Sequence, residues 1–105
     1  MFKSSREVIL RTDKFSKAIE FYGKTLSLPI TYKNSKIVGF ETGSFCLYVE
    51  KGNEHPPVFE FIVKDLKREK AKLLEAGCIV IEENPKIPRC YIKDPYGFVF
   101  NMHEG

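Results

Sequence analysis

The apolar positions change spacing within the first thirty residues of the chain. Over residues 7–12 they follow the alternation of a strand, and from Phe15 to Leu26 they recur at intervals of three and four, which predicts an amphipathic helix. Asp13 stands between these segments and is placed to serve as the N-cap of the helix. Pro29 then ends the helix, because it cannot continue the hydrogen-bond pattern.

Three short β-rich segments follow the first helix. They cover residues 30–33, 36–41 and 45–50, and turn residues separate them at Asn34-Ser35 and Thr42-Gly43-Ser44. A polar segment, residues 51–57, ends in two prolines and predicts a short linker. The first part of the chain is therefore predicted to run strand, helix, then three strands.

The same order begins again after the linker. Residues 58–63 predict a strand, Asp65 begins a helix, and Gly77 stands where a residue after the helix end is expected. Three more strands are predicted at residues 78–81, 89–93 and 98–103. The sequence thus predicts an α+β fold of two βαβββ modules, at about residues 5–52 and 56–104, within a single domain covering residues 1–105.

The amino-acid composition limits the kinds of partner that this protein could bind. The 17 basic and 14 acidic residues are interspersed and leave a formal charge of +3, which is typical of a solvated surface and not of a nucleic-acid interface. No segment approaches the roughly 20 apolar residues that a membrane span requires. The three cysteines lack a Cys-x-x-Cys spacing, so we expect a soluble protein in the reducing cytoplasm, without nucleic-acid or membrane partners.

Several motifs on this framework resemble the vicinal oxygen chelate superfamily, the glyoxalase, bleomycin-resistance and dioxygenase group. In the first module these are Phe21-Tyr22 and Leu26-Ser27-Leu28-Pro29, where the usual family form is Leu-Gly-Leu. In the second module Phe61-x-Val63-x-Asp65-Leu66 leads into the helix, and Asp94-Pro95-Tyr96-Gly97-Phe98 matches the late turn of the family. The resemblance covers nearly the whole chain.

The resemblance implies a curved eight-stranded mixed sheet with the helices on its convex side and the active site in the concave cleft. In metal-binding members, the first and last strand of each module supply one His or Glu ligand each. Matched residue by residue, those positions fall on Glu7, Tyr48, Val58 and Asn101, and a shift of one residue would replace Glu7 by Arg6. Tyr48, Val58 and Asn101 are unsuited to a divalent metal, so we expect no metal and no other cofactor.

Two alternatives concern the chemistry of the cleft. Strand alternation puts Glu7, Glu60 and His103 on one face, which would allow a displaced metal site, although the same residues could simply line a solvated cleft. Cys46 is interpreted as a small buried hydrophobic residue in preference to a nucleophile, and His55 as a solvated loop residue.

The residues predicted to face the cleft are polar or aromatic. Arg11 could hold an anionic ligand or pair internally with a carboxylate, and Tyr48 offers a flat apolar face with one polar tip, whereas Tyr22 is expected in the core. The full predicted ligand-binding set is Glu7, Arg11, Tyr48, Glu50, Glu60, Asn101 and His103.

Metal-free members of the superfamily include antibiotic-binding resistance proteins, which bind a drug between two subunits without a reaction. The resemblance therefore implies a small-molecule-binding protein that forms a homodimer. Two alternatives stay open, namely a lyase, isomerase or dioxygenase that uses a displaced metal or a carboxylate base, and a dimerisation or regulatory module without a ligand. Neither the ligand nor the dimer arrangement can be read from the sequence.

Overall fold

The computed structural model describes residues 2–105, and its chain divides into two compact units. The first unit comprises residues 6–58, and the second comprises residues 2–5 together with residues 59–105. The division therefore passes through β1 (Lys3–Thr12) and β5 (His55–Val63), which each contribute to both units.

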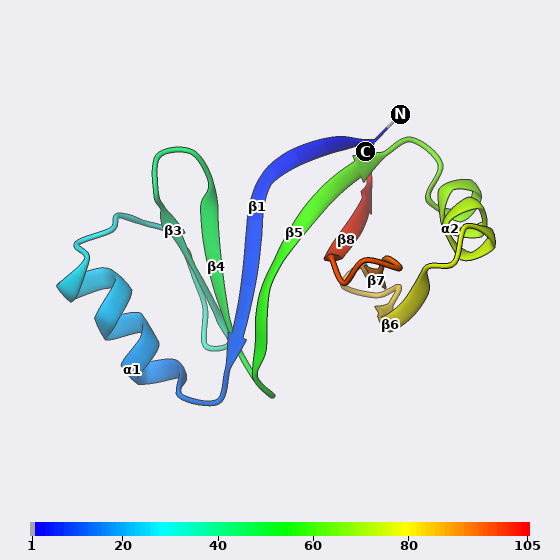
Figure 1. The fold of residues 1–105 in the computed structure, drawn as a ribbon. Helices are drawn as coiled ribbons and strands as arrows, with labels where there is room; N and C mark the ends of the chain where they lie inside the picture. Colours follow the sequence, from blue (N-terminus) through cyan, green and yellow to red (C-terminus); the bar gives the residue numbers. More distant parts are fainter. Residues whose placement is uncertain (1) are drawn as a thin grey trace. The chain divides into compact units, whose positions relative to one another are not determined.

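The first unit combines one helical segment with four main strands (Figure 1). After β1 come α1 (Phe15–Glu20), the π-helical turn η1 (Phe21–Thr25), and the strands β2 (Ile30–Lys33), β3 (Ile37–Glu41) and β4 (Cys46–Lys51). The strand order is β2-β3-β4-β1, with β1 parallel to β4 and the other pairs antiparallel.

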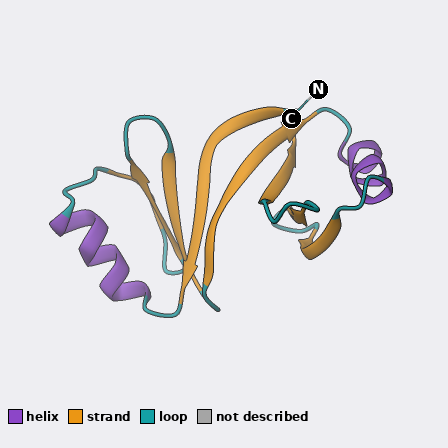
Figure 2. Ribbon diagram, in the orientation of Figure 1, coloured by secondary structure: helices purple, strands orange, loops and turns teal. Residues whose placement is uncertain are grey.

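The second unit repeats that arrangement (Figure 2). After β5 come α2 (Leu66–Glu75), β6 (Ile79–Asn84), β7 (Arg89–Lys93) and β8 (Val99–Glu104). The order is β5-β8-β7-β6, with β5 parallel to β8 and the other pairs antiparallel. The predicted α+β class, with eight strands in a mixed sheet, is confirmed.

Each unit has its own hydrophobic core between its helix and its strands. In the first unit the fully buried residues include Val38, Phe40 and Val49, and α1 contributes partly buried side chains to them. In the second unit Ile92 and Met102 are fully buried, and Leu66 and Leu73 of α2 pack on that cluster. The three- and four-residue spacing in the first helix therefore has the predicted packing function.

Most predicted boundaries are right within two residues, but β1 begins at Lys3 instead of residue 7, β5 begins at His55 instead of residue 58, and β6 ends at Asn84 instead of residue 81. Asp13 was predicted to cap α1, but the N-cap is Lys14 and no side chain caps it in the usual way. Instead, the Lys14 amide donates to the Thr12 hydroxyl at 3.1 Å. The prediction for α2 is confirmed, because the Asp65 carboxylate accepts from the Arg68 amide at 3.1 Å.

The predicted linker is also shorter than expected. β4 continues to Lys51, and β5 already begins at His55, so that Pro56 and Pro57 lie within a strand. Prolines are tolerated at the start of a strand because their missing N–H need not enter a ladder. Within residues 2–105, no helix is long and apolar enough to cross a membrane.

Candidate functional site

The strand alternation in the first unit follows the predicted register. Val8 and Leu10 of β1 pack with the core beneath α1, as do Leu47 and Val49 of β4. Because side chains alternate along a strand, Glu7, Ile9 and Arg11 belong to the opposite face, together with Tyr48 and Glu50 of β4. The parallel ladder sets Ile9 beside Tyr48 and Arg11 beside Glu50.

Arg11 and Glu50 form an ion pair on this face. The Arg11 Nε donates to Glu50 Oε1 at 3.0 Å, and the two side chains are only 14% and 21% exposed. The aliphatic part of Arg11 lies against Gly52, where an added Cβ would come within 2.9 Å of its Cδ. Of the two roles considered for Arg11, the internal ion pair is therefore present.

Tyr48 has a close neighbour across the ladder. It stands opposite Gly39 of β3, and a Cβ at Gly39 would be 2.8 Å from Tyr48 Cε1 and 3.0 Å from Thr31 Oγ1. Only glycine leaves enough room for the ring to lie over the neighbouring strand. Tyr48 remains partly exposed, so its ring offers a positioned aromatic surface on the face opposite α1.

In the second unit the corresponding face carries Glu60 and Asn101. Asn101 is 3% exposed, and its Oδ1 accepts from the Cys90 amide at 2.8 Å while its Nδ2 donates to Glu60 Oε2 at 3.0 Å. Both ends of the buried amide are thus satisfied within the unit. Asn101 therefore fixes the position of Glu60 and of the neighbouring β7 backbone.

His103 lies on the same face as Asn101. Phe100 and Met102, the alternate residues of β8, belong to the core, and Ile62 is the register partner of His103 on β5. His103 is partly buried. Within this unit, sequence reasoning therefore assigned Glu60, Asn101 and His103 to the correct face.

The residues at the four family ligand positions do not fit a divalent metal. Val58 is 2% exposed and aliphatic, and the amide of Asn101 is already bonded to Cys90 and Glu60. Divalent metals in such sites need several imidazole or carboxylate donors, which these positions do not supply. No group of three or more His, Cys, Asp or Glu side chains suited to a metal is found in the part of the chain that the structure describes.

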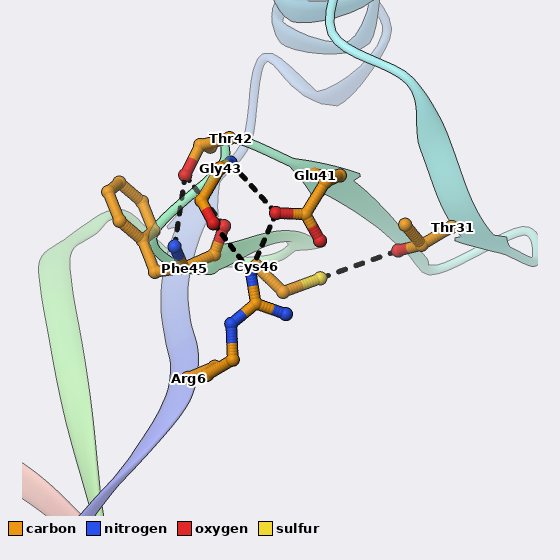
Figure 3. A network of polar contacts seen from close by, with 7 residues as sticks. All are labelled: Arg6, Thr31, Glu41, Thr42, Gly43, Phe45 and Cys46. Carbon is orange, nitrogen blue, oxygen red and sulfur yellow. Dashed lines mark hydrogen bonds and ion pairs between the residues drawn. The ribbon is translucent and has the colours of Figure 1, made fainter.

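Arg6 belongs to a separate network at the β3–β4 turn (Figure 3). Its Nη2 donates to Glu41 Oε2 at 2.7 Å and to the Gly43 carbonyl at 3.0 Å, and the Gly43 amide donates to the same carboxylate oxygen at 2.8 Å. The hydrogen bond from Arg6, followed by that from the Gly43 amide, lowers the pKa of the Glu41 carboxyl group. The bond to Glu41 in turn raises the pKa of the Arg6 guanidinium. Arg6 thus stabilises a turn.

The three cysteines are buried, and none of them forms a disulfide within residues 2–105. Cys46 is 7% exposed, and its Sγ lies 3.4 Å from Thr31 Oγ1 (Figure 3). Cys90 is 2% exposed, and burial raises the pKa of its thiol, with a further contribution from Glu83. A buried thiol with a raised pKa is a poor nucleophile, so Cys90 is interpreted as a packing residue.

A cavity that the sequence analysis did not identify lies on the helix side of the first unit. It measures about 590 Å³ and is lined by the end of β1, by α1 and η1, and by residues 54–56. His55, interpreted above as a solvated loop residue, is partly buried in its wall and is in β5. The only local signal was the pair Lys14 and Lys17, which stand three residues apart beside the apolar face of the helix.

Known structures provide a further comparison, whereas no protein-family model and no curated protein matches the sequence. A hypothetical protein from Bacillus halodurans C-125 aligns with a TM-score of 0.70 and 14% identity over 99% of this chain and 94% of that protein. A glyoxalase/bleomycin resistance protein/dioxygenase superfamily member from Vibrio splendidus 12B01 aligns with a TM-score of 0.69 and 14% identity over 100% of both chains. Homoprotocatechuate 2,3-dioxygenase from Brevibacterium fuscum aligns at 0.69 and 18% identity over 97% of this chain, but over only 36% of the dioxygenase.

Proposed function

We propose that this chain, which has the vicinal oxygen chelate fold of the glyoxalase, bleomycin-resistance and dioxygenase superfamily, binds a small organic molecule without a resident metal. Each unit would offer a binding surface of its own on the sheet face opposite its helix, and in the first unit this surface consists of Glu7, Arg11, Tyr48 and Glu50. In the second unit it consists of Glu60, Asn101 and His103.

One observation carries the proposal. In each unit the parallel strand pair places polar side chains next to each other on the face opposite its helix, Arg11 beside Glu50 in the first unit and Glu60 beside Asn101 in the second. Tyr48 is held over Gly39 and is still partly exposed. A positioned aromatic ring with a few fixed polar groups is the usual composition of a small-molecule site.

The metal-free part of the proposal rests on donor chemistry. A buried valine and a doubly hydrogen-bonded asparagine stand at two of the four family ligand positions. We expect the purified protein, incubated with Zn²⁺ or Ni²⁺ and then desalted, to retain less than one ion per chain by elemental analysis. One tightly held ion per chain that disappears in Glu7→Ala would favour the metal-dependent enzyme instead.

A fragment screen tests binding itself. Small aromatic and heteroaromatic compounds would be screened by saturation-transfer NMR against the wild type, Tyr48→Phe and Tyr48→Ala. We expect hits that survive in Tyr48→Phe and lose about 1 to 3 kcal/mol of binding free energy in Tyr48→Ala, because the ring supplies apolar contact area. Hits that bind folded Tyr48→Ala equally well would refute the role of this face.

We also propose that the protein is a homodimer. Large apolar side chains are exposed on the outer strands of both units, with Ile30 at 49% and Tyr32 at 51% on β2, and Ile79 at 55% on β6. Apolar residues exposed together on outer strands are typical of surfaces that bind another subunit. Sedimentation equilibrium at micromolar concentration should give twice the monomer mass of 12.1 kDa, and a monomer under these conditions would contradict the proposal.

A further inference from the structure

The cavity on the helix side of the first unit has an apolar wall. Its apolar lining comes from β1, α1, η1 and β5, and consists of Leu10, Ala18, Phe21, Tyr22 and Pro56. The rings of Phe21 and Tyr22 meet edge to face with centroids 5.2 Å apart, and Tyr22 in turn contacts Phe40 of the core. Phe21 is 47% exposed, so a large aromatic surface faces solvent at this cavity.

The charged residues around the cavity are mostly basic. Lys14, Lys17 and Arg11 line it, and Glu54 is the one carboxylate among its lining residues in the described part of the chain. Arg11 is engaged by Glu50. Across residues 2–105, neither lysine ammonium has a carboxylate within ion-pair distance, so both are available to a ligand.

Size and composition together define a class of ligand. A volume of about 590 Å³ lies within the range typical of small-molecule sites. The apolar wall favours a flat hydrocarbon or aromatic body, and the lysines favour a negative charge at its edge. We propose that this cavity is a second binding site, which accepts a small aromatic carboxylate with its ring against Phe21 and its carboxylate at Lys14 and Lys17.

This site shares Arg11, but not Tyr48 or Glu50, with the surface proposed above for the main function. Leu10, Ala18 and Tyr22 belong to the helix side of the first unit, where they pack around its core. Tyr48 and Glu50 lie on the opposite face of the same strands. A ligand in the cavity would therefore leave the Tyr48 ring uncovered.

Three probes that share one aromatic body test the charge preference. These are 1-naphthoate, 1-naphthalenemethanol and 1-naphthylmethylamine, titrated into ¹⁵N-labelled full-length protein and followed by amide chemical shifts. We expect 1-naphthoate to bind about tenfold more tightly than the amine, and to shift the amides of Ala18, Phe21 and His55. Equal affinities for all three probes, or the absence of shifts at these amides, would overturn the proposal.

Matched lysine variants test the contacts. The double variant Lys14→Gln/Lys17→Gln should weaken 1-naphthoate binding by about fivefold to twentyfold and leave the neutral alcohol unaffected. Lys24→Gln serves as the control, because Lys24 is exposed on η1 and does not line the cavity. If Lys24→Gln weakens 1-naphthoate binding as much per charge removed as the double variant does, the loss reflects the overall charge of the protein. That result would refute the site.

The shift map also separates this inference from the main proposal. If 1-naphthoate shifts only the amides of Tyr48 and Glu50, the second site is refuted while the binding face proposed for the first unit gains support. Phe21→Ala gives an independent check, because this partly exposed ring is a wall of the cavity. We expect that variant to remain folded and to weaken 1-naphthoate by about threefold to tenfold, and an unchanged affinity would count against the site.

Discussion

The parallel strand pairs of the two units carry different polar pairs. In the first unit the register partners Arg11 and Glu50 form an ion pair whose side chains retain some exposure. In the second unit the register partners Glu60 and Asn101 are joined by an amide–carboxylate hydrogen bond, and Asn101 is almost fully buried. The same type of parallel strand pair therefore holds an ion pair in one unit and an amide–carboxylate hydrogen bond in the other.

This difference distinguishes residues that could bind a ligand from residues that mainly stabilise the fold. Asn101 also accepts from the Cys90 amide, so its amide connects β7 with β8 and with Glu60. A buried polar group with every bond made inside the protein contributes more to stability than to ligand recognition. Arg11 and Glu50 keep access to solvent, and their pair is the better candidate for exchange with a charged ligand.

The residues that follow the helices also differ between the two units. α2 is followed by Gly77, whose φ is +100°. At the N-terminus of α2, the Arg68 amide donates to the Asp65 carboxylate and the Leu66 amide donates to the Glu104 carboxylate. After η1 the left-handed position is taken by Ser27, with φ at +55°. Glycine is the usual residue at such a position, and a serine in this conformation is strained because of its Cβ.

The largest expected effect follows from removing the Asn101 amide. Asn101→Leu would leave the buried Cys90 amide without its acceptor and Glu60 without a donor. We expect the free energy of unfolding to fall by about 2 to 4 kcal/mol in urea denaturation, because a buried polar group loses its partner. Glu60→Gln, which keeps an acceptor for Asn101, should cost less than half as much. A larger loss in Glu60→Gln than in Asn101→Leu would mean that the Glu60 carboxylate contributes more to stability than the Asn101 amide.

A smaller effect is expected from the ion pair of the first unit. Arg11→Met keeps an apolar stem against Gly52 but removes the guanidinium that binds Glu50. We expect a loss of about 1 to 2 kcal/mol, since the pair is only partly exposed. A double-mutant cycle with Glu50→Gln measures the coupling. A loss equal to that of Asn101→Leu would remove the distinction drawn between the two units.

Substitutions after the two helices should change the free energy of unfolding in opposite directions. Ser27→Gly should raise stability by about 0.5 to 1 kcal/mol, because glycine adopts positive φ without strain. Gly77→Ser should lower it by about 1 kcal/mol for the same reason. Thermal unfolding of both variants checks the pair, and a stabilised Gly77→Ser would contradict the conformational explanation.

The smallest effect is a pH dependence at the β3–β4 turn. The pKa of Glu41 lies below its ordinary value of 4.5, so its contribution to stability is present above that value. The contribution is lost as pH falls through the lowered pKa, where the carboxyl group becomes protonated in the folded protein. The difference in melting temperature between wild type and Glu41→Gln should therefore shrink between pH 6 and strongly acidic pH. A difference that grows on acidification would contradict this assignment.

The repeat, the element order and the strand faces could be predicted from the sequence alone. Period-two and period-3.6 patterns report which side of an element is buried, and they assigned Val8 and Leu10 to the core and Glu60 and His103 to the opposite face. The Asp65 cap and the Gly77 position were also predicted, because both depend on local backbone chemistry. The predictions failed at Asp13, where the Lys14 amide bonds to the Thr12 hydroxyl, and at Pro56, which lies within β5.

Pairings between distant residues were decided only by the tertiary structure. The sequence left open which carboxylate Arg11 could pair with, and the β1–β4 register selected Glu50. The contact of Tyr48 with Gly39 depends on the antiparallel register of β3 and β4. The helix-side cavity likewise combines segments more than thirty residues apart. A one-dimensional pattern encodes which face a side chain occupies, whereas its partner depends on strand register and close packing, which are properties of the folded chain.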